Sequence, residues 1–163
     1  LIESKDIDLL VMGGPQGPGC YCYPNDLLRK YLETLGGNYD FVTIDTEAGL
    51  EHISRRTIPR VDKMFVISDS SARGIRSAGR VYELIKGLRS AVKEVYLVVT
   101  KTSDGSLDSL KEEIEKTGLK LIGDIPLDPK VVSRDLEGQP LYALPDDSVA
   151  VQAVQKIFEK AFK

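Results

Sequence analysis

The chain has 163 residues, of which 42% are hydrophobic and 29% charged, and its formal net charge is −3. A chain of this length can bury a sizeable core, so we expect one domain over residues 1–163. The small negative charge argues against a nucleic-acid partner. No apolar run approaches the roughly 20 residues that span a bilayer, and nothing resembles a signal peptide. The composition therefore predicts a soluble, cytoplasmic protein without a nucleic-acid or membrane partner.

Strand-like and helix-like patterns alternate along the chain. Runs of β-branched and aromatic residues predict buried strands at residues 7–12, 39–44, 63–68, 95–99 and 119–122. Apolar residues at helical spacing predict helices from about Pro24 to Gly36 and over residues 75–85, 107–114 and 149–158. Apolar strands that alternate with amphipathic helices are typical of an α/β fold. We expect a mostly parallel sheet covered by helices on both faces.

Turn-forming or polar residues stand at the carboxyl ends of the expected strands. The carboxyl ends of parallel strands meet at one edge of a sheet, and open α/β sheets bind their ligands there. The sequence therefore predicts a ligand site where five strand ends gather, at Gly13, Asp45, Asp69, Thr100 and Pro126.

The expected strand 39–44 leads into an acidic residue, Asp45, and then a glycine, Gly49. An acid beside a phosphate site usually holds Mg²⁺, directly or through water, or orients an attacking water. Gly49 lets the backbone approach a ligand or pivot without a Cβ clash. The alternative is an Asp that ends a strand and starts a turn, which is a common arrangement.

Cys20 and Cys22 are the two cysteines, and they lie in a loop rich in glycine and proline. Cysteines separated by one residue do not easily form an unstrained disulfide, so we interpret them as thiols or metal ligands. A structural zinc site needs four ligands, and two chains related by a two-fold axis would supply four sulfurs. Thiolates accept both Zn²⁺ and Ni²⁺, which leaves the metal open. The alternative is a pair of small apolar side chains under a loop.

Several of these motifs together resemble one family. Residues 45–51 resemble the switch II segment of the MinD/ParA/nitrogenase-iron-protein class of dimeric ATPases. The glycine-rich segment 13–20 resembles the cysteine-bearing loop of nitrogenase iron protein. The Cys20-Tyr21-Cys22 element is similar to that of the CooC-type ATPases, which mature nickel carbon monoxide dehydrogenase. Residues 69–80 and 123–128 add further matches.

The resemblance implies a P-loop NTPase-like fold and a homodimer that binds ATP or ADP with Mg²⁺. It implies that Asp45 senses Mg²⁺ or positions water, and that Gly49 lets switch II move. It also implies that Cys20 and Cys22 hold Zn²⁺ or Ni²⁺ at the dimer interface. The resulting hypothesis is a nucleotide-switched ATPase that assists nickel insertion into its client, carbon monoxide dehydrogenase. The alternatives are a MinD/ParA-like positioning ATPase and a non-enzymatic metal-binding or scaffold relative.

Two further segments are expected to form the base pocket. Thr100 and Lys101 stand after the fourth strand, where relatives commonly place an Asn-Arg pair against adenine. Pro126 would offer an apolar surface to the other side of the ring, and Asp128 a polar group at its edge. The departure from Asn-Arg leaves the base preference open. A strand-to-helix turn is the alternative explanation of Pro126 and Asp128.

The chain departs from the family in one respect, because no Gly-Lys-Ser or Gly-Lys-Thr occurs in it and it opens at Leu1. A P-loop works by turning consecutive backbone N–H groups and a lysine onto the phosphates. We therefore expect residues 1–163 to be the C-terminal two-thirds of a MinD-like ATPase domain, inactive as an ATPase alone. A naturally truncated, non-hydrolysing relative is the alternative.

Overall fold

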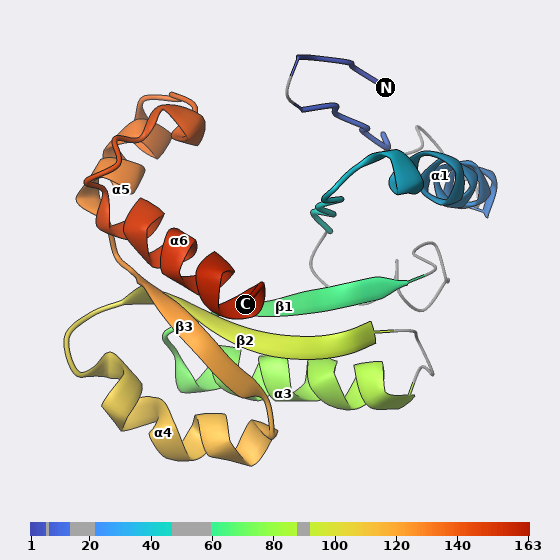
Figure 1. Ribbon diagram of the computed structural model, residues 1–163. Helices are drawn as coiled ribbons and strands as arrows, with labels where there is room; N and C mark the ends of the chain where they lie inside the picture. The colour runs from blue at the N-terminus through green and yellow to red at the C-terminus, as the bar shows by residue number, and fades with distance from the viewer. Residues whose placement is uncertain (6, 14–21, 47–59, 88–91) are drawn as a thin grey trace. The chain divides into compact units, whose positions relative to one another are not determined.

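The computed structural model describes residues 1–5, 7–13, 22–46, 60–87 and 92–163 of the chain. The chain divides into two compact units, Leu1–Pro59 and Arg60–Lys163. In the described residues, the second unit holds the sheet and most of the helices, whereas the first holds one long helix (Figure 1).

The second unit is built around three parallel strands in the order β1-β2-β3. These are β1 (Val61–Asp69), β2 (Val92–Thr102) and β3 (Lys120–Pro126). One face of the sheet is covered by α3 (Ala72–Gly87) and α4 (Ser106–Thr117), and the other by α6 (Val149–Ala161) (Figure 1). The chain between β3 and α6 forms α5 (Pro129–Leu136) and the short 3₁₀ helix η2 (Leu141–Ala143). The predicted α/β fold, with a parallel sheet and helices on both faces, is confirmed.

The middle strand β2 carries the core because its side chains alternate between the two faces of the sheet. One hydrophobic cluster forms between the sheet and α6, from Tyr96, Val98, Ile122, Ile157 and Ala161. Leu97 and Val99 are completely buried. By alternation they point to the opposite face, which α3 and α4 cover.

Helix α6 approaches β3 very closely at Gly123. A Cβ atom at Gly123 would lie 2.7 Å from the Ile157 Cγ1 atom, well inside the distance at which carbon atoms normally pack. Glycine therefore lets Ile157 sit against the strand, and this contact holds the C-terminal half of α6 on the sheet.

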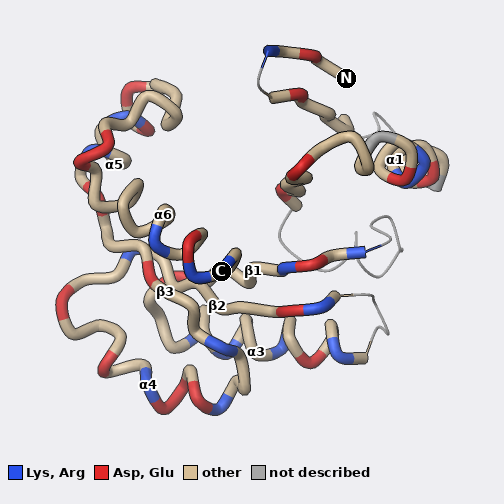
Figure 2. Tube along the Cα trace, in the orientation of Figure 1, with Lys and Arg blue, Asp and Glu red and all other residues tan. Residues whose placement is uncertain are grey.

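Charged residues of both signs are mixed along α3 and α4 (Figure 2). An ion pair between Arg76 and Glu113, at 3.4 Å, joins the two helices. Because the Arg76 side chain is 56% exposed, the pair contributes little to stability. Packing rather than charge therefore holds this layer together.

The first unit contains α1 (Cys22–Leu35), followed by the short 3₁₀ helix η1 (Gly36–Asn38). The helix predicted from about Pro24 to Gly36 is thus confirmed. The Tyr39 hydroxyl donates to the Asp8 carboxylate at 2.6 Å. This hydrogen bond lowers the pKa of Asp8 and raises the pKa of Tyr39.

The strands predicted at residues 7–12 and 39–44 do not form, and both predictions are wrong. Within the described residues, 7–12 make only an isolated antiparallel bridge between Leu9 and Ile2, and 39–44 form no ladder. A strand forms only where a neighbour pairs with its backbone N–H and C=O groups, and β propensity alone does not supply that neighbour. Asp45 therefore does not follow a strand, and it is exposed.

Candidate functional site

The carboxyl ends of β1, β2 and β3 lie side by side. Asp69, the last residue of β1, pairs with Thr100 of β2. Thr102, the last residue of β2, pairs with Pro126 at the end of β3. Three of the five predicted strand ends therefore gather at one edge, as expected, and the other two belong to the first unit.

Asp69 and Ser71 shape the turn from β1 into α3. The Asp69 Oδ1 atom accepts hydrogen bonds from the Ser71 N–H at 3.2 Å and from the Ser71 hydroxyl at 2.6 Å. The Ser71 Oγ atom accepts from the Gly74 N–H at 3.0 Å, which caps α3. A Cβ atom at Gly74 would lie 2.2 Å from Asp69 Oδ1, so a larger residue there would displace the Asp69 carboxylate. The Asp69 Oδ1 atom and the Ser71 side chain thus end the strand and start the helix.

Lys101 adopts a left-handed backbone conformation near the end of β2. Its φ is 57°, and no other non-glycine residue in the described part of the chain has a positive φ. The pairing of β2 with β3 shifts register between Thr100 and Thr102, so Lys101 is the extra residue of a β-bulge. The Ser70 hydroxyl holds it by donating to the Lys101 carbonyl at 2.9 Å. This conformation costs about 1–2 kcal/mol, and such strain clusters at functional sites.

Thr102 and Asp124 join β2 to β3 at the same edge. The buried Thr102 hydroxyl donates to Asp124 Oδ2 at 2.6 Å. The Thr102 carbonyl accepts a hydrogen bond from the Leu127 N–H at 3.0 Å. These bonds hold the start of the loop after β3 beside the end of β2.

Asp128 is buried and binds the starts of two helices. Its Oδ1 atom accepts from the Lys130 N–H at 2.8 Å and caps α5. Its Oδ2 atom accepts from the Ser148 hydroxyl at 2.6 Å and from the Ala150 N–H at 3.2 Å, both at the start of α6. The Ser148 hydroxyl, and then the two N–H groups, lower the pKa of Asp128 against the opposing effect of burial. Both carboxylate oxygens are therefore occupied by the protein itself.

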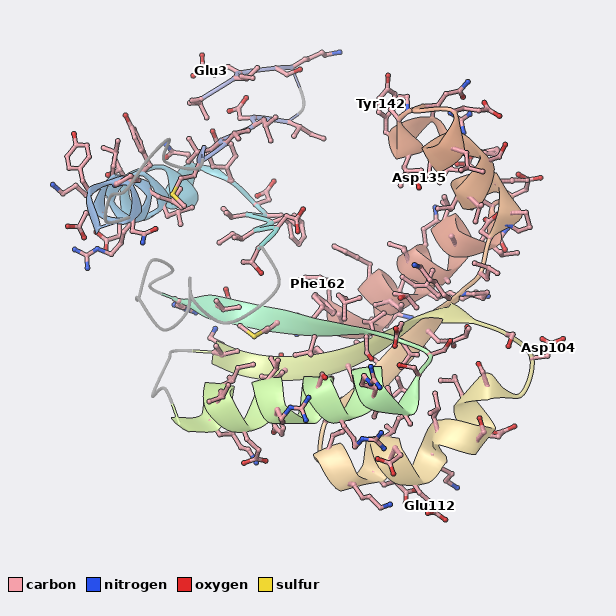
Figure 3. The ribbon with its side chains drawn as sticks, turned by 180° about the vertical axis from the view of Figure 1, so that it is seen from behind. Glu3, Asp104, Glu112, Asp135, Tyr142 and Phe162 are labelled. Carbon is pink, nitrogen blue, oxygen red and sulfur yellow. The ribbon has the colours of Figure 1, made fainter. Side chains whose placement is uncertain are left out.

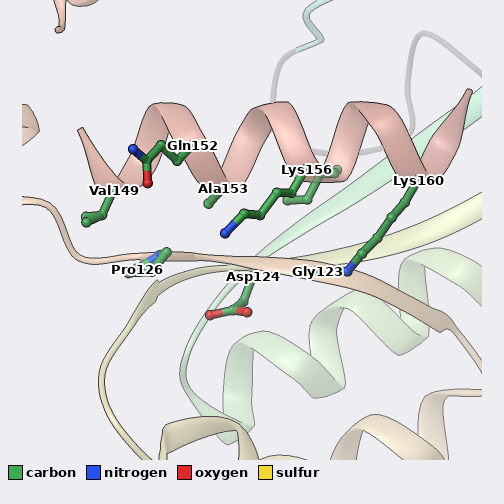
Figure 4. A pocket seen from close by; sticks show the side chains of 9 residues that line it. Gly123, Asp124, Pro126, Val149, Gln152, Ala153, Lys156 and Lys160 are labelled. Carbon is green, nitrogen blue, oxygen red and sulfur yellow. The ribbon is translucent and has the colours of Figure 1, made fainter. Parts of the chain in front are cut away.

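A pocket of about 320 Å³ lies between β3 and α6 (Figure 4). Its lining includes Asp124 and Pro126 from β3, and Val149, Gln152, Ala153 and Lys156 from α6. The lining mixes apolar side chains with polar and charged ones, and the volume lies at the lower end of the range of small-molecule sites.

Two lysines of α6 line this pocket and differ in what they bind. The Lys160 ammonium donates to the Ile122 carbonyl at 3.3 Å. Lys156 makes no hydrogen bond or ion pair with the residues that the structure describes, and its side chain extends across the pocket above β3 (Figure 4). The Lys156 ammonium is therefore available to an acceptor atom of a ligand.

The four residues predicted for the base pocket lie at the same edge of the sheet but in different surroundings. Pro126 lines the pocket described above. Thr100 and Lys101 lie at the neighbouring end of β2, and the Thr100 hydroxyl donates to the Ser68 carbonyl at 3.2 Å. Asp128 faces the starts of α5 and α6. Their contact with a nucleotide base stays a prediction.

Sequence reasoning missed Ser148, Gln152 and Lys156, and it named no helix at α5, although the strand-to-helix turn considered for Pro126 and Asp128 does form. One signal was available, because Ser148 immediately precedes an apolar helical pattern, which is the place of a helix N-cap. The spacing of Val149, Gln152 and Lys156 also puts them on one face of α6. Which face meets a pocket could not be read from that spacing.

The remaining predicted site residues belong to the first unit. Cys20 and Gly49 lie outside the described residues, as does the side chain of Cys22, the first residue of α1. Among the described residues, no group of three His, Cys, Asp or Glu side chains could hold a metal ion. In that same part of the chain, no helix is long and apolar enough to cross a membrane. The roles predicted for Asp45, Gly49 and the two cysteines stay predictions.

Known proteins resemble this chain over most of its length, although no protein-family model matches it. An uncharacterised ATP-binding protein of Methanocaldococcus jannaschii is 43% identical over 160 residues, which cover 98% of this chain and 63% of that protein. The carbon monoxide dehydrogenase accessory protein CooC of Rhodospirillum rubrum is 29% identical over 147 residues, which cover 88% of this chain and 54% of that protein. The chain thus spans less than two-thirds of the length of these relatives.

The fold also matches solved structures. The septum site-determining protein MinD of Pyrococcus horikoshii, solved in complex with Mg-ADP, matches with a TM-score of 0.64 at 20% identity, over 85% of this chain and 57% of that chain. At this identity the match shows a shared fold. The chain is thus similar in sequence to an ATP-binding protein and to CooC, and it shares its fold with MinD.

Proposed function

We propose that this chain contributes the base-binding part of an ATP site in a MinD/ParA/CooC-type ATPase. The pocket between β3 and α6, at the carboxyl edge of the sheet, carries the proposal. The relative that is 43% identical is named as an ATP-binding protein, and the MinD structure that shares the fold was solved with Mg-ADP.

The lining of the pocket suits a purine base. Pro126, Val149 and Ala153 offer apolar surface to the faces of the ring, and the unpartnered Lys156 ammonium offers a donor to an acceptor atom at its edge. Lys101, whose carbonyl is held by Ser70, extends the site toward the end of β2. Thr100 would lie beside it.

Asp45 and Gly49 would act on the phosphate side of the site. In this proposal Asp45 holds Mg²⁺ or positions the attacking water, and Gly49 lets the switch segment move when the nucleotide changes. No segment of these 163 residues carries a lysine-bearing phosphate loop, so we expect this chain alone to bind ATP weakly and not to hydrolyse it. Turnover by this chain that disappears in Asp45→Ala would contradict that expectation.

A finer proposal concerns the metal and the client. Cys20 and Cys22 of two chains would together hold one Zn²⁺ or Ni²⁺ in a homodimer, which would serve nickel insertion into carbon monoxide dehydrogenase. The Cys-x-Cys spacing and the similarity to CooC support it. Equilibrium dialysis should give one metal per two chains, with weaker binding at lower pH because protons compete for the thiolates. One metal per chain, unaffected by Cys22→Ser, would reject this model.

Titration of the chain with ATP, followed by ¹H–¹⁵N NMR, tests the base pocket. We expect the amide signals of Gly123, Asp124 and Ala153 to shift. Lys156→Met keeps the apolar part of the side chain and should weaken ATP binding by about tenfold, the value of one hydrogen bond to a charged group. Lys160→Met is the matched control, because Lys160 lines the same pocket but already binds the Ile122 carbonyl. Equal losses in both variants, or no shift at the pocket, would contradict the proposal.

A further inference from the structure

We propose that Asp128 and Ser148 are positioning residues that set the separation of the two walls of the β3–α6 pocket. This role deepens the proposed function, on which the nucleotide part of its test rests. In this role Asp128 contributes to the site without contacting the nucleotide base.

The two walls of the pocket are β3 and α6, which lie side by side although residues 127–148 separate them in the chain. Every residue from 129 to 147 is exposed or partly exposed, and Leu136 and Tyr142 are 83% and 90% exposed. Figure 3 shows Asp135 and Tyr142 on this segment, well away from the sheet. A segment that buries so little surface has low local stability. It therefore does not by itself fix where α6 begins.

Helix α6 is fixed at two points, and the pocket extends along the helix from Val149 to Lys160. At its C-terminal half, Ile157 packs against Gly123, and Ala161 joins the hydrophobic cluster. At its N-terminal end, Ser148 is completely buried and Asp128 is 4% exposed. The hydrogen bond between them, at 2.6 Å, joins the loop after β3 to the start of α6. The exposed segment 129–147 is thus flanked by Asp128 and Ser148, which form one buried hydrogen bond.

A carboxylate suits this contact because it can bind several donors at once. Besides the Ser148 hydroxyl, Asp128 accepts the N–H groups of Lys130 and Ala150. The Ser148 Oγ atom itself accepts from the Val151 N–H at 3.2 Å. Hydrogen bonds to an ionised carboxylate are shorter and stronger than neutral ones, and a helix N-terminus favours negative charge. Loss of the Ser148 hydroxyl would remove one of the three donors to Asp128 and would leave the Val151 N–H without its acceptor.

Ser148→Ala tests the role with two readouts, the amide exchange of Ala150 and Val151 and the affinity for ATP in the NMR titration. We expect exchange to become about tenfold faster and ATP binding about tenfold weaker, because the hydrogen bonds of Ser148 to Asp128 and to the Val151 N–H are both lost. Ser148→Thr keeps the hydroxyl and should restore both. Asp128→Asn keeps the size of the side chain and should act in the same direction as Ser148→Ala.

Lys130→Met is the matched control. Lys130 and Asp147 form an ion pair at 2.7 Å that joins the same two segments, but their side chains are 45% and 75% exposed. Exposed pairs contribute little, so this variant should leave both readouts unchanged. An equal effect of Lys130→Met would show that any link between the segments suffices, and would overturn the specific role of the buried pair.

The remaining outcomes also decide the proposal. Unchanged amide exchange in Ser148→Ala would overturn it, and so would faster exchange with unchanged ATP binding, because Ser148 would then be only a helix cap. If ATP shifts no pocket signal even in the wild-type chain, the proposed function fails instead. The positioning role is then decided by nuclear Overhauser effects between the Pro126 and Val149 side chains. Equal intensities in the wild type and in Ser148→Ala would reject it, and weaker ones in the variant would sustain it.

Discussion

The two ends of the three-stranded sheet are stabilised by different chemistry. Toward the amino ends of the strands, aromatic rings and charged groups surround Tyr96. The Lys63 and Lys120 ammonium groups lie 5.8 Å and 5.2 Å from the centre of its ring, and Phe65 stacks on it at 5.9 Å. Glu94 accepts from Lys63 at 2.5 Å and also from the Tyr96 hydroxyl. This end is closed by packing and ion pairs.

At the carboxyl ends, short hydrogen bonds between hydroxyl and carboxylate groups stabilise the segments at the strand ends. Ser71 binds Asp69, Thr102 binds Asp124, and Ser148 binds Asp128, each at 2.6 Å. This end also contains the strained Lys101 and the open pocket. The two ends therefore differ, because packing and ion pairs stabilise the amino end, whereas the carboxyl end combines a strained residue with the pocket proposed as a site. Variants at the two ends should therefore change different properties.

The largest effect on stability is expected at Ile157, where α6 meets the sheet. Ile157 is 6% exposed, so Ile157→Ala should lower the free energy of unfolding by about 3 kcal/mol through lost burial and a new cavity. Urea denaturation measures the change. Val154→Ala on the same helix is the control, because Val154 is 42% exposed and its truncation should cost much less. Similar losses at both positions would show that α6 is not anchored at Ile157.

Lys101→Gly should have a smaller effect, of opposite sign. Glycine adopts a positive φ without strain, so the variant should be more stable than Lys101→Ala by about 1 kcal/mol. Both variants lose the ammonium group and should weaken ATP binding alike if Lys101 reaches the nucleotide. Urea denaturation and the ATP titration separate these two effects. Equal stability of the two variants would show that the bulge stores no strain.

Acidification should weaken both ends of the sheet. Hydrogen bonds from Lys63 and Tyr96 lower the pKa of Glu94, and the Ser148 hydroxyl lowers the pKa of Asp128. A carboxyl group with a lower pKa in the folded than in the unfolded state stabilises the fold above its unfolded pKa. That contribution is lost as the pH falls through the folded value, so stability should drop below about pH 4.

Glu94→Gln and Asp128→Asn remove the titrating group at one end each. Urea denaturation between pH 7 and pH 2.5 should show a flatter dependence in each variant than in the wild type. If the stability of both variants depended on pH as steeply as that of the wild type, other carboxyl groups would govern acid unfolding.

The smallest effect is expected from Lys120→Met at the amino end. It removes a cation from the face of Tyr96 but keeps the apolar part of the side chain, so thermal unfolding should show a loss of about 0.5–1 kcal/mol. ATP binding should not change, because Lys120 begins β3 at the end opposite the pocket. Lys111→Met, at an exposed position of α4, is the control. A change in ATP affinity at Lys120 would break the division between the two ends.

Local patterns in the sequence were sufficient for most of the second unit. The β-branched runs predicted the three strands, and helical spacing predicted α3, α4 and α6. The gathering of Asp69, Thr100 and Pro126 at one edge followed from the parallel arrangement. These features depend on side-chain propensity and on hydrophobic periodicity, and both can be recognised within a short segment of sequence.

Only the tertiary structure decided how the site is assembled. The partner of Asp128 is Ser148, 20 residues further along the chain, and the Ser70 hydroxyl that holds the Lys101 carbonyl comes from a different strand end. The apolar segment 39–44 has strand-like composition but forms no strand, since it has no paired neighbour within the described residues. Strand pairing, bulge conformation and shared helix caps all depend on which distant backbone groups meet. That is decided by the packed chain as a whole and not by any local pattern.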